Sequence, residues 1–497
     1  LARHAKKGAR IGYDPMLHTS AGLARLEAAA KKGGFVLAAV SENPIDAAWT
    51  DQPARPTAKV RPHGVEFAGV PAAEKRRLIA AAVKEAGADA VVLTSPTSVA
   101  WAFNIRGGDV SRSPLPLSRA IVPADGRAPL FVAPEKVDNA LSAHLGDVDI
   151  RAESDIAEAL ARFGQEKKNV ALDPALAPVK YAMALKEAGA RVVDQTDPCA
   201  LPRATKNRTE LDGTRAAHIR DGAAVTRFLH WLATEAQGGD VDEITAATKL
   251  EAFRAETGRL VDLSFDTISG AASNGAIVHY KVSTATNQKL KVGSLYLIDS
   301  GVYYNDGTTD ITRTVAIGKP TAEMKDRFTR VLKGHIALAT MRFPAGTTGH
   351  QIDMIARKPL WDAGLDYDHG TGHGVGSFLG VHEGPQRIAK APNAQALKPG
   401  MILSNEPGFY KTGEFGIRIE NLIVVTEPQP VPGGARPMMA FETITLAPID
   451  LACIDRALLT DNERQWLNAY HARVRATIGP LVPKTVAAWL DAATAPI

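Results

Sequence analysis

Five side chains of the kinds that bind metal ions or carry protons lie in the second half of the chain: Asp299, Asp310, His373, Glu406 and Glu420. Asp299 ends an apolar run, and Asp310 follows eleven positions later, beyond an Asn-Asp-Gly turn. A hairpin would bring these two carboxylates together. Like charges that close on half-buried strands are costly unless a cation neutralises them. Turn capping is the alternative, and it fits Asp306 but not Asp299.

Three histidines, His369, His373 and His382, fall within fourteen residues. Residues 368–376 read Asp-His-Gly-Thr-Gly-His-Gly-Val-Gly. We expect these glycines to leave the backbone of His373 unusually free and its ring approachable. A single histidine is more often a core residue than a ligand. Three together favour a functional site, because histidine is the commonest metal ligand and proton carrier.

The two glutamates each belong to a segment with the pattern of a strand. Glu406 follows Leu-Ser-Asn and precedes Pro-Gly, where a strand is expected to end in a turn. Residues 416–425 alternate between apolar and polar side chains, with Arg418 and Glu420 on the inward polar face. A carboxylate beside the apolar end of this run is expensive to bury unpaired. Glu420 therefore either pairs with Arg418 alone or binds a metal ion, and we favour the metal ion.

Together, the two aspartates, the two glutamates and His373 carry four negative charges. Two divalent cations would offset these charges and leave room for a bridging hydroxide. A ligand set of carboxylates with one imidazole and no thiolate favours Mn²⁺, Mg²⁺, Co²⁺ or Zn²⁺ over softer metals. Because a two-metal centre polarises a carbonyl group and lowers the pKa of a shared water, the pattern indicates hydrolysis.

The composition is that of an ordinary globular protein. Apolar residues make up 45% of the 497 positions and charged residues 23%, which excludes a disordered or fibrous chain. The net charge of +4 gives no nucleic-acid footprint, and no apolar run approaches the roughly 18 residues that cross a bilayer. Cys199 and Cys453 are too few for a disulfide framework or a multi-thiolate metal site. We expect a soluble, cytoplasmic protein that binds neither nucleic acid nor membrane.

The elements that must position the site indicate a mixed α/β (α+β) fold. We expect helices near residues 71–86, 209–236, 241–255 and 322–340, and strands near residues 88–93, 119–123 and 130–133. The sequence Arg-Gly-Gly-Asp at 106–109 has the glycines of a phosphate-binding turn. Because no helical pattern follows it, we interpret it as an ordinary turn.

Residues 10–15 and 169–174 resemble each other, and each is followed by an Ala-rich helical stretch, a short apolar strand and a polar segment. The second copy closes a complete α/β unit, whereas the first has nothing before it, and the chain begins with Leu. We therefore interpret residues 1–60 as the end of a first creatinase-like domain whose front is absent. An α/β domain at 61–200 and a catalytic domain at 201–497 are expected to follow, in line with about 150 residues per domain.

Six motifs surround the candidate residues. They are Ile-Asp-Ser-Gly from residue 298, Asp-Gly-Thr-Thr-Asp-Ile-Thr-Arg-Thr from 306, His-Gly-Thr-Gly-His-Gly-Val-Gly from 369, Val-His-Glu-Gly-Pro from 381, Asn-Glu-Pro-Gly from 405 and Gly-Ile-Arg-Ile-Glu-Asn from 416. These motifs resemble those of the pita-bread metallopeptidases, and within them the long, three-domain aminopeptidase P (Xaa-Pro aminopeptidase) family. The resemblance is tight over residues 205–450. The preceding α/β domain is similar to the creatinase-like middle domain of that family.

The resemblance implies roles for individual residues. It makes the five residues named first the ligands of two divalent metal ions, with manganese expected and cobalt or zinc as alternatives. All five have the expected residue type, which argues against the creatinase branch, which lacks metal. Asp310 and Glu420 are expected to bridge both ions. The other site residues of the family correspond to His279, His369 and His382, and to Tyr410 and Arg418 beside the ligands.

The implied activity is hydrolysis of the N-terminal Xaa-Pro bond of peptides whose second residue is proline. The α-amine of the substrate binds one metal ion near Asp299, the bridging hydroxide attacks the carbonyl before proline, and Glu406 acts as general base and proton carrier. His279, His369 and His382 orient the substrate and stabilise the oxyanion. The family usually forms homodimers through its catalytic domain, so a homodimer is expected.

Other functions are also compatible with these motifs. Prolidase, which acts on Xaa-Pro dipeptides, and methionine aminopeptidase use the same scaffold. The long front half and the sequence Val-His-Glu-Gly-Pro favour aminopeptidase P over both. A non-catalytic binding module of the same fold is a further alternative. Such modules typically lose metal ligands, whereas all five candidate ligands are present in this chain.

Overall fold

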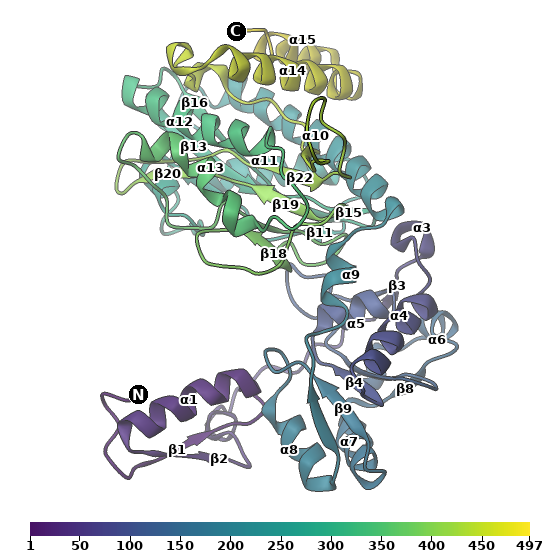
Figure 1. Cartoon of the computed structure of the whole chain (residues 1–497). Coiled ribbons are helices and arrows are strands. Elements are labelled where there is room, and N and C mark those ends of the chain that lie inside the picture. Colours follow the sequence, from purple (N-terminus) through teal and green to yellow (C-terminus); the bar gives the residue numbers. More distant parts are fainter. The chain divides into compact units, whose positions relative to one another are not determined.

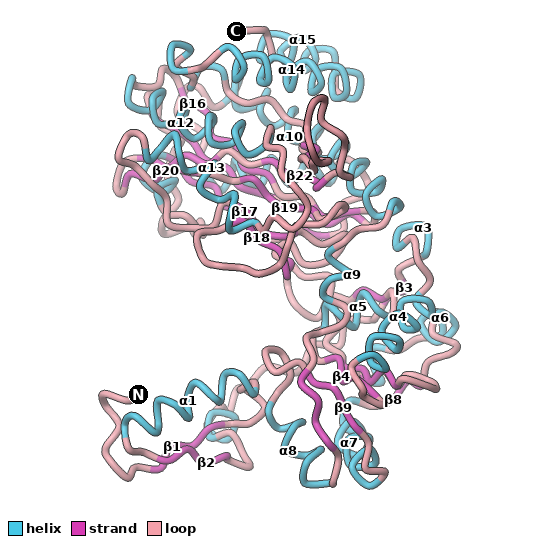
Figure 2. The backbone as a smooth tube through the Cα atoms, in the orientation of Figure 1, coloured by secondary structure: helices cyan, strands magenta, loops and turns pink.

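The computed structural model describes residues 1–497 and contains two compact units, Leu1–Arg203 and Ala204–Ile497. Both units combine helices with strands, as the ribbon and the backbone trace show (Figure 1; Figure 2). The mixed α/β fold expected from the sequence is therefore confirmed. The division into three domains stays a prediction.

A six-stranded sheet in the order β10-β9-β4-β6-β7-β8 is the centre of the first unit. The strands of this unit are β1 (Arg10–Tyr13), β2 (Val36–Ala39), β3 (Arg61–Pro62), β4 (Ala90–Leu93), β5 (Ile105–Arg106), β6 (Arg119–Pro123), β7 (Pro129–Phe131), β8 (Asp149–Arg151), β9 (Asn169–Leu172) and β10 (Arg191–Asp194). Its helices are α1 (Ser20–Gly33), α2 (Pro44–Ala48), α3 (Val65–Ala68), α4 (Ala72–Glu85), α5 (Pro96–Ala102), α6 (Asn139–His144), α7 (Ile156–Gln165), α8 (Val179–Ala188) and, at the boundary, α9 (Ala200–Ala204).

The first unit contains two strand–helix–strand segments of the same kind. β1 pairs in parallel with β2, with α1 between them in sequence, and β9 pairs in parallel with β10, with α8 between them. Both copies therefore have the elements expected from the similarity of residues 10–15 and 169–174. The Arg-Gly-Gly-Asp loop after β5 folds back on itself, with the Gly107 N–H donating to the Pro114 carbonyl (2.9 Å). No helix follows it before β6, so it is the ordinary turn expected.

Two antiparallel sheets carry the candidate site in the second unit, one in the order β12-β13-β16 and one in the order β18-β17-β19-β22-β23. The strands are β11 (Asp262–Leu263), β12 (Ile268–Ala271), β13 (Ser294–Ser300), β14 (Val302–Tyr304), β15 (Gly307–Thr308), β16 (Ile311–Ile317), β17 (Gly372–Gly374), β18 (Glu383–Ile388), β19 (Ile402–Asn405), β20 (Gly408–Lys411), β21 (Phe415–Arg418), β22 (Asn421–Val425) and β23 (Phe441–Thr443). The helices are α10 (Arg208–Glu235), α11 (Glu243–Ala255), α12 (Ala322–Ala339), α13 (Gly349–Trp361), α14 (Asp461–Ile478) and α15 (Lys484–Ala493).

Capping residues explain where the main helices of this unit begin. Asn207 and Glu210 form a capping box at the start of α10, and the Thr321 side chain accepts a hydrogen bond from the backbone of α12. These two helices and α11 match the sequence prediction. The sequence did not predict α13, α14 or α15. Pro359 lies inside α13, and a proline is a sequence signal against a helix at that position.

Apolar clusters hold the strands from behind. In one cluster, Phe228 of α10 and Leu250 of α11 are buried with Ile298 of β13. In the other, Leu332 of α12 and residues of α14 are buried with Ile417 of β21. Because this burial removes a large apolar area from water, it fixes the strands whose ends carry the polar candidates.

Two local expectations about the site differ from the structure. Residues 416–425 are not one strand, because β21 pairs with β20 whereas β22 pairs with β19, so Glu420 lies at the break between two sheets. The glycines around His373 adopt no positive φ, so they do not give the backbone unusual freedom. Instead, a Cβ atom at Gly372 would lie 2.0 Å from the Ser404 carbonyl oxygen, so glycine here permits close approach of neighbouring strands.

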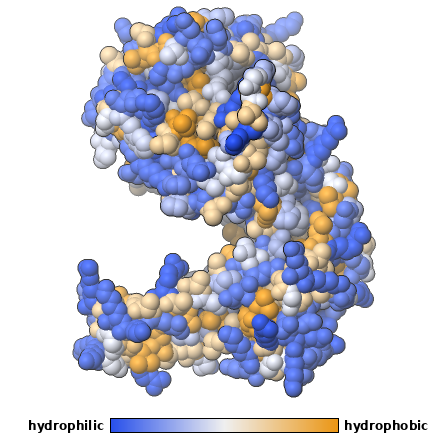
Figure 3. Space-filling view, in the orientation of Figure 1, coloured by the Kyte–Doolittle hydropathy of each residue, from blue (hydrophilic) through white to orange (hydrophobic).

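The face of the molecule drawn in Figure 3 is largely hydrophilic, with hydrophobic residues in scattered patches. No helix of residues 1–497 is both long enough and apolar enough to span a bilayer. Cys199 and Cys453 are buried free thiols, which agrees with the expectation that neither belongs to a disulfide framework.

Gly334 allows α12 and α13 to pack closely, because a Cβ atom at this position would lie 2.0 Å from the Ala356 carbonyl oxygen. We expect Gly334→Ala to lower the free energy of unfolding by about 1–3 kcal/mol, the usual cost of overpacking a core. The measurement is denaturant-induced unfolding of the full chain. Gly479→Ala is the matched control, since nothing lies within 4 Å of the added Cβ atom. Equal stability of the two variants would contradict the prediction.

Candidate metal centre and active site

One cavity of about 590 Å³ in the second unit collects nearly all of the candidate residues. It is lined by Asp299, Asp310, His373, Glu406 and Glu420, and also by His279, His369, His382 and Arg418. Tyr410 is the one candidate that does not line it, and it contacts two residues that do. The structure thus brings together side chains that are spread over more than a hundred positions of sequence.

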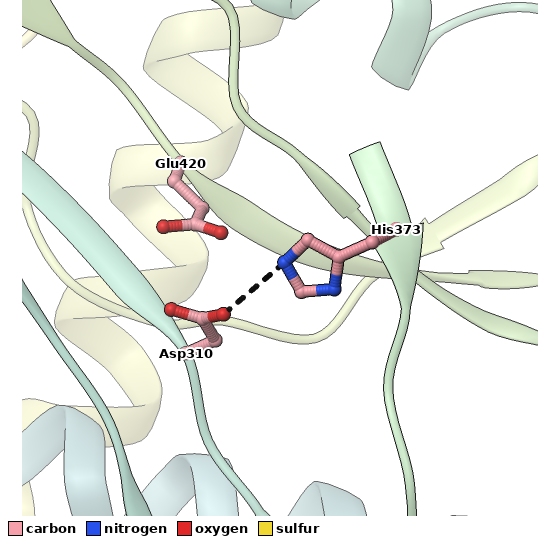
Figure 4. Close-up of side chains that lie close together, drawn as sticks. All are labelled: Asp310, His373 and Glu420. Carbon is pink, nitrogen blue, oxygen red and sulfur yellow. Dashed lines mark ion pairs between the residues drawn. The ribbon is translucent and has the colours of Figure 1, made fainter. Parts of the chain in front are cut away.

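Asp310, His373 and Glu420 form the tightest group of potential metal ligands, with ligand atoms within 4.8 Å of one another (Figure 4). His373 Nε2 lies 3.5 Å from Asp310 Oδ2 and 3.5 Å from Glu406 Oε1. The other ring nitrogen, Nδ1, is 3.0 Å from the Gly374 carbonyl oxygen and donates to it. This bond selects the tautomer whose Nε2 lone pair faces the carboxylates, as a metal-binding histidine requires.

Asp299 is held by Arg418, whose Nη2 donates to Asp299 Oδ2 at 2.6 Å. Both side chains are almost fully buried. The alternative in which Glu420 pairs with Arg418 alone is therefore wrong, because the Arg418 guanidinium donates to Asp299 of β13 instead. Asp299 Oδ1 is buried and has no hydrogen-bond partner.

The carboxylates disfavour one another's charged forms. Burial raises the pKa of Glu420 well above its usual range, and the neighbouring charges of Asp310 and Asp299 raise it further. Burial also raises the pKa of Asp310, with Asp299 and Glu406 acting in the same direction. Burial raises the pKa of Glu406, and the charge of Asp299 acts in the same direction. Such mutual shifts are characteristic of functional sites.

These residues fit divalent cations. Asp299 Oδ1 lacks a partner although it is buried, and a bound cation would satisfy it. A positive charge would also relieve the repulsion that raises the pKa values of the neighbouring carboxyl groups. Carboxylate oxygens with one imidazole nitrogen suit Mn²⁺, Co²⁺ or Zn²⁺.

Two hydroxyl groups hold the glutamates, and the sequence prediction missed both. Thr312 Oγ1 donates to Glu420 Oε2 at 2.7 Å, and Ser404 Oγ donates to Glu406 Oε1 at 3.0 Å. The Ser404 hydroxyl also accepts the backbone N–H of His373 at 2.9 Å, so one serine aligns two of the five candidates. The sequence signal that could have identified them is their spacing, because Thr312 lies two residues after Asp310 and Ser404 two residues before Glu406.

Arg418, Tyr410 and His369 form a chain of hydrogen bonds at the wall of the cavity. Arg418 Nη1 donates to the Tyr410 hydroxyl (2.6 Å), which donates to His369 Nε2 (2.9 Å), and His369 Nδ1 donates to the Gly370 carbonyl (2.8 Å). Burial lowers the pKa of His369 to about 3, and the charge of Arg418 acts in the same direction. His369 is therefore neutral, and both of its ring nitrogens are occupied.

The two remaining histidines have a different environment. His382 lies edge-to-face against His373, with ring centroids 4.3 Å apart, and His279 is exposed at the cavity. Burial of the ring lowers the pKa of His382 to about 4. Both rings are open to a molecule that enters the cavity.

A buried ion pair supports the segment before Asp310, and the sequence prediction missed it as well. Arg254 of α11 binds Asp221 of α10 through two hydrogen bonds of 2.8 and 2.9 Å. Asp221 Oδ2 also accepts the Thr309 hydroxyl at 3.0 Å. The residue next to Asp310 is thereby anchored to two helices. Nothing in sequence spacing links these positions, because the contact depends on how the helices cover the sheet.

Three family models match successive parts of the chain. The Creatinase/Prolidase N-terminal domain matches residues 51–210, metallopeptidase family M24 matches residues 212–427, and the C-terminal region of peptidase M24 matches residues 437–497. A Neosartorya fischeri protein named "Probable Xaa-Pro aminopeptidase P" is 40% identical over 508 residues, which covers 99% of this chain and 78% of that protein. The chain belongs to the Xaa-Pro aminopeptidase P family. A family member from Paracoccidioides brasiliensis is 40% identical over 95% of this chain.

Solved structures agree with this family. The crystal structure of X-prolyl aminopeptidase from Caenorhabditis elegans, described as a cytosolic enzyme with a di-nuclear active site, covers 100% of this chain with a TM-score of 0.94 and 36% identity. The match spans 82% of that chain. An Xaa-Pro dipeptidase from Bacillus anthracis covers 76% of this chain and 99% of its own, with a TM-score of 0.62 and 25% identity.

Membership of the Xaa-Pro aminopeptidase P family confirms the resemblance drawn from the motifs and the classification as a metallopeptidase. The roles of the individual residues stay predictions. The cavity also contains residues that the sequence did not single out, among them Phe265, Ile268, Val278 and Arg387. Arg387 pairs in register with His373 across β17 and β18, so both side chains lie on the same face of that sheet.

We expect Mn²⁺ to raise the unfolding temperature of chelator-treated protein more at about pH 8 than at about pH 6. Asp310, Glu406 and Glu420 have raised pKa values, so protons compete with the cation as the pH falls. In addition, a carboxyl group whose pKa is raised in the folded state stabilises the fold while it is protonated, and this stabilisation is lost as the pH rises through that pKa. The carboxylates therefore repel one another more at high pH, and a bound cation has more repulsion to relieve there. Thermal unfolding with and without Mn²⁺ at both pH values is the measurement. An equal shift at both would contradict the prediction.

Proposed function

We propose that this protein is a metal-dependent aminopeptidase that removes the N-terminal residue from peptides whose second residue is proline. The observation that carries the proposal is the acidic cavity, where Asp310, His373 and Glu420 converge with two further carboxylates. The high similarity to the Caenorhabditis elegans X-prolyl aminopeptidase along the whole chain supports the same activity. The 40% identity over 99% of this chain to a protein named "Probable Xaa-Pro aminopeptidase P" favours aminopeptidase P over prolidase.

We infer that the five acidic and imidazole residues would hold two divalent ions, Mn²⁺ being the first candidate, and that Asp310 and Glu420 would contribute to both sites. Such a centre would supply polarisation of the scissile carbonyl and a water of lowered pKa as the nucleophile. Arg418 keeps Asp299 oriented toward the cavity. Thr312 and Ser404 do the same for the two glutamates through their hydroxyl groups.

Glu406 is the general base and proton carrier in this proposal. Its carboxylate faces the cavity, and burial raises its pKa toward the range in which it can take a proton from water and release it again. When the C–N bond before proline breaks, the proline nitrogen must receive a proton to leave as an amine, as in the hydrolysis of any amide. Glu406 is positioned to deliver it, because it lines the same cavity as the ions' ligands.

The histidines divide the remaining work. His279 and His382 are open to the cavity, so we assign them the contacts that orient the substrate and stabilise the oxyanion. His369 has both ring nitrogens engaged, so we assign it to holding Tyr410 rather than to contacting substrate. The free α-amine of the substrate would bind at the metal site beside Asp299, and this contact would place the cut one residue from the N-terminus. A cytoplasmic location and a homodimer stay predictions.

We expect Glu406→Gln to bind Mn²⁺ but to lose about 10²- to 10⁴-fold in kcat, the range for removal of a general base. Steady-state kinetics on an Xaa-Pro-Yaa tripeptide and metal analysis of the purified variant are the measurements. Glu414→Gln is the matched control, because Glu414 pairs with Lys411 in the turn between β20 and β21, outside the cavity. A wild-type kcat for Glu406→Gln would exclude Glu406 as the base.

The choice between aminopeptidase P and prolidase depends on substrate length. We expect hydrolysis of Arg-Pro-Pro-type peptides and Xaa-Pro-Yaa tripeptides to be faster than hydrolysis of the Xaa-Pro dipeptide with the same first two residues. Activity should disappear with a chelator and return with Mn²⁺. Exclusive cleavage of the dipeptide would favour prolidase. Absence of both metal binding and hydrolysis would favour a non-catalytic binding module.

A further inference from the structure

Glu406 and Glu420 reach the cavity from the adjacent ends of two paired strands. Asn405, the last residue of β19, pairs in antiparallel register with Asn421, the first residue of β22. Glu406 immediately follows Asn405, and Glu420 immediately precedes Asn421. Whatever fixes these two asparagines therefore fixes where both carboxylates leave the backbone.

His335 of α12 lies behind this strand end and touches both asparagines. Its Nδ1 is 3.1 Å from the Asn405 carbonyl oxygen, and its Nε2 is 3.0 Å from the Asn421 side-chain nitrogen. An amide nitrogen can only donate, so Nε2 accepts and Nδ1 carries the proton that goes to the carbonyl. The Asn405 side chain returns a hydrogen bond to the His335 carbonyl at 2.9 Å. One neutral imidazole thus connects the two strand ends.

The environment of His335 keeps the ring neutral and immobile. The side chain is fully buried, and burial lowers its pKa to about 3, with the charge of Arg313 acting in the same direction. The Asn421 side-chain oxygen accepts from Arg313 Nη2 at 2.8 Å, and Arg313 Nη1 donates to the Glu420 carbonyl at 2.7 Å. Asn421 therefore has its orientation set from both sides.

Burying a polar ring costs free energy unless its nitrogens are hydrogen-bonded, and an apolar side chain would avoid that cost. A side chain that bonded only one strand would satisfy a backbone group and nothing more. His335 instead uses both nitrogens, one for each strand that carries a glutamate. It does not line the cavity, so it cannot touch substrate or cation directly.

We propose that His335 is a positioning residue that sets the spacing of Glu406 and Glu420 by bridging Asn405 and Asn421, and thereby sets the affinity for divalent cation and the rate of hydrolysis. The inference relies on the proposed function in assigning both glutamates to the metal centre. It predicts that either half of the bridge is insufficient alone.

The test uses two substitutions that each keep one half of the bridge. In His335→Asn, the amide can still donate to the Asn405 carbonyl, and in His335→Gln, the side-chain oxygen can still accept from Asn421. We expect both variants to bind Mn²⁺ about tenfold or more weaker in calorimetric titration of chelator-treated protein, the range for outer residues that orient ligands. In kinetics at saturating Mn²⁺, we expect kcat to fall while KM for the tripeptide stays close to wild type.

His471→Asn is the matched control. His471 of α14 is also a fully buried histidine whose pKa burial lowers to about 3, but its Nε2 accepts from the Ile449 backbone N–H rather than from a strand that carries a glutamate. It should lose comparable stability while keeping its Mn²⁺ affinity within about twofold of wild type. Circular dichroism and thermal unfolding show whether each variant is folded. His335→Gln is the milder change if His335→Asn does not fold.

The outcomes separate this inference from the proposed function. Mn²⁺ affinity within about twofold of wild type in a folded His335 variant would overturn the positioning role, whatever the stability. Equal losses of affinity in the His335 and His471 variants would overturn it too, because they would reflect general destabilisation. Weaker Mn²⁺ binding in the His335 variants of a protein that cleaves no Xaa-Pro peptide would support the bridge and reject the peptidase activity.

Discussion

Mutual repulsion among four carboxylates that face one cavity is the constraint on which the catalytic unit depends. Asp299, Asp310, Glu406 and Glu420 all line the same cavity, and the pKa values of three of them are raised by burial and by one another. The free-energy cost of gathering these carboxylates must be offset by the stability of the rest of the fold. The apolar clusters behind β13, β16 and β21 supply the stability that holds these strands in place.

Each acidic group is aligned by a specific neighbour of its own. Arg418 holds Asp299, Thr312 holds Glu420 and Ser404 holds Glu406. The support for Asp310 comes through the backbone, because its neighbour Thr309 is bonded to Asp221. The groups that align the carboxylates belong to the protein itself, and fixed hydrogen-bond partners of this kind are the basis of electrostatic preorganisation.

The sequence predicted the elements and residues whose patterns are local. The helices α10 and α12 have capping residues and apolar positions at helical spacing, and the acidic candidates interrupt apolar runs in a way that is visible in one dimension. The sequence could not predict that residues 416–425 divide between two sheets, because alternation continues across the break at Glu420. It also could not show that Asp221 lies behind Thr309, since their contact depends on how α10 covers the sheet. The pairing of Arg418 with Asp299 was missed because it joins strands β21 and β13, which are far apart in the sequence.

The C-terminal region supports the site indirectly, through Arg313. Arg313 donates to the carbonyl oxygens of Ala447 and Pro448 and to the hydroxyl of Tyr470 in α14, while it also holds the backbone of Glu420. A fragment that stopped before α14 would leave the buried Arg313 guanidinium without one of its acceptors, next to the backbone of Glu420. A shortened form of this enzyme that keeps the support of Glu420 intact therefore has to extend through Tyr470.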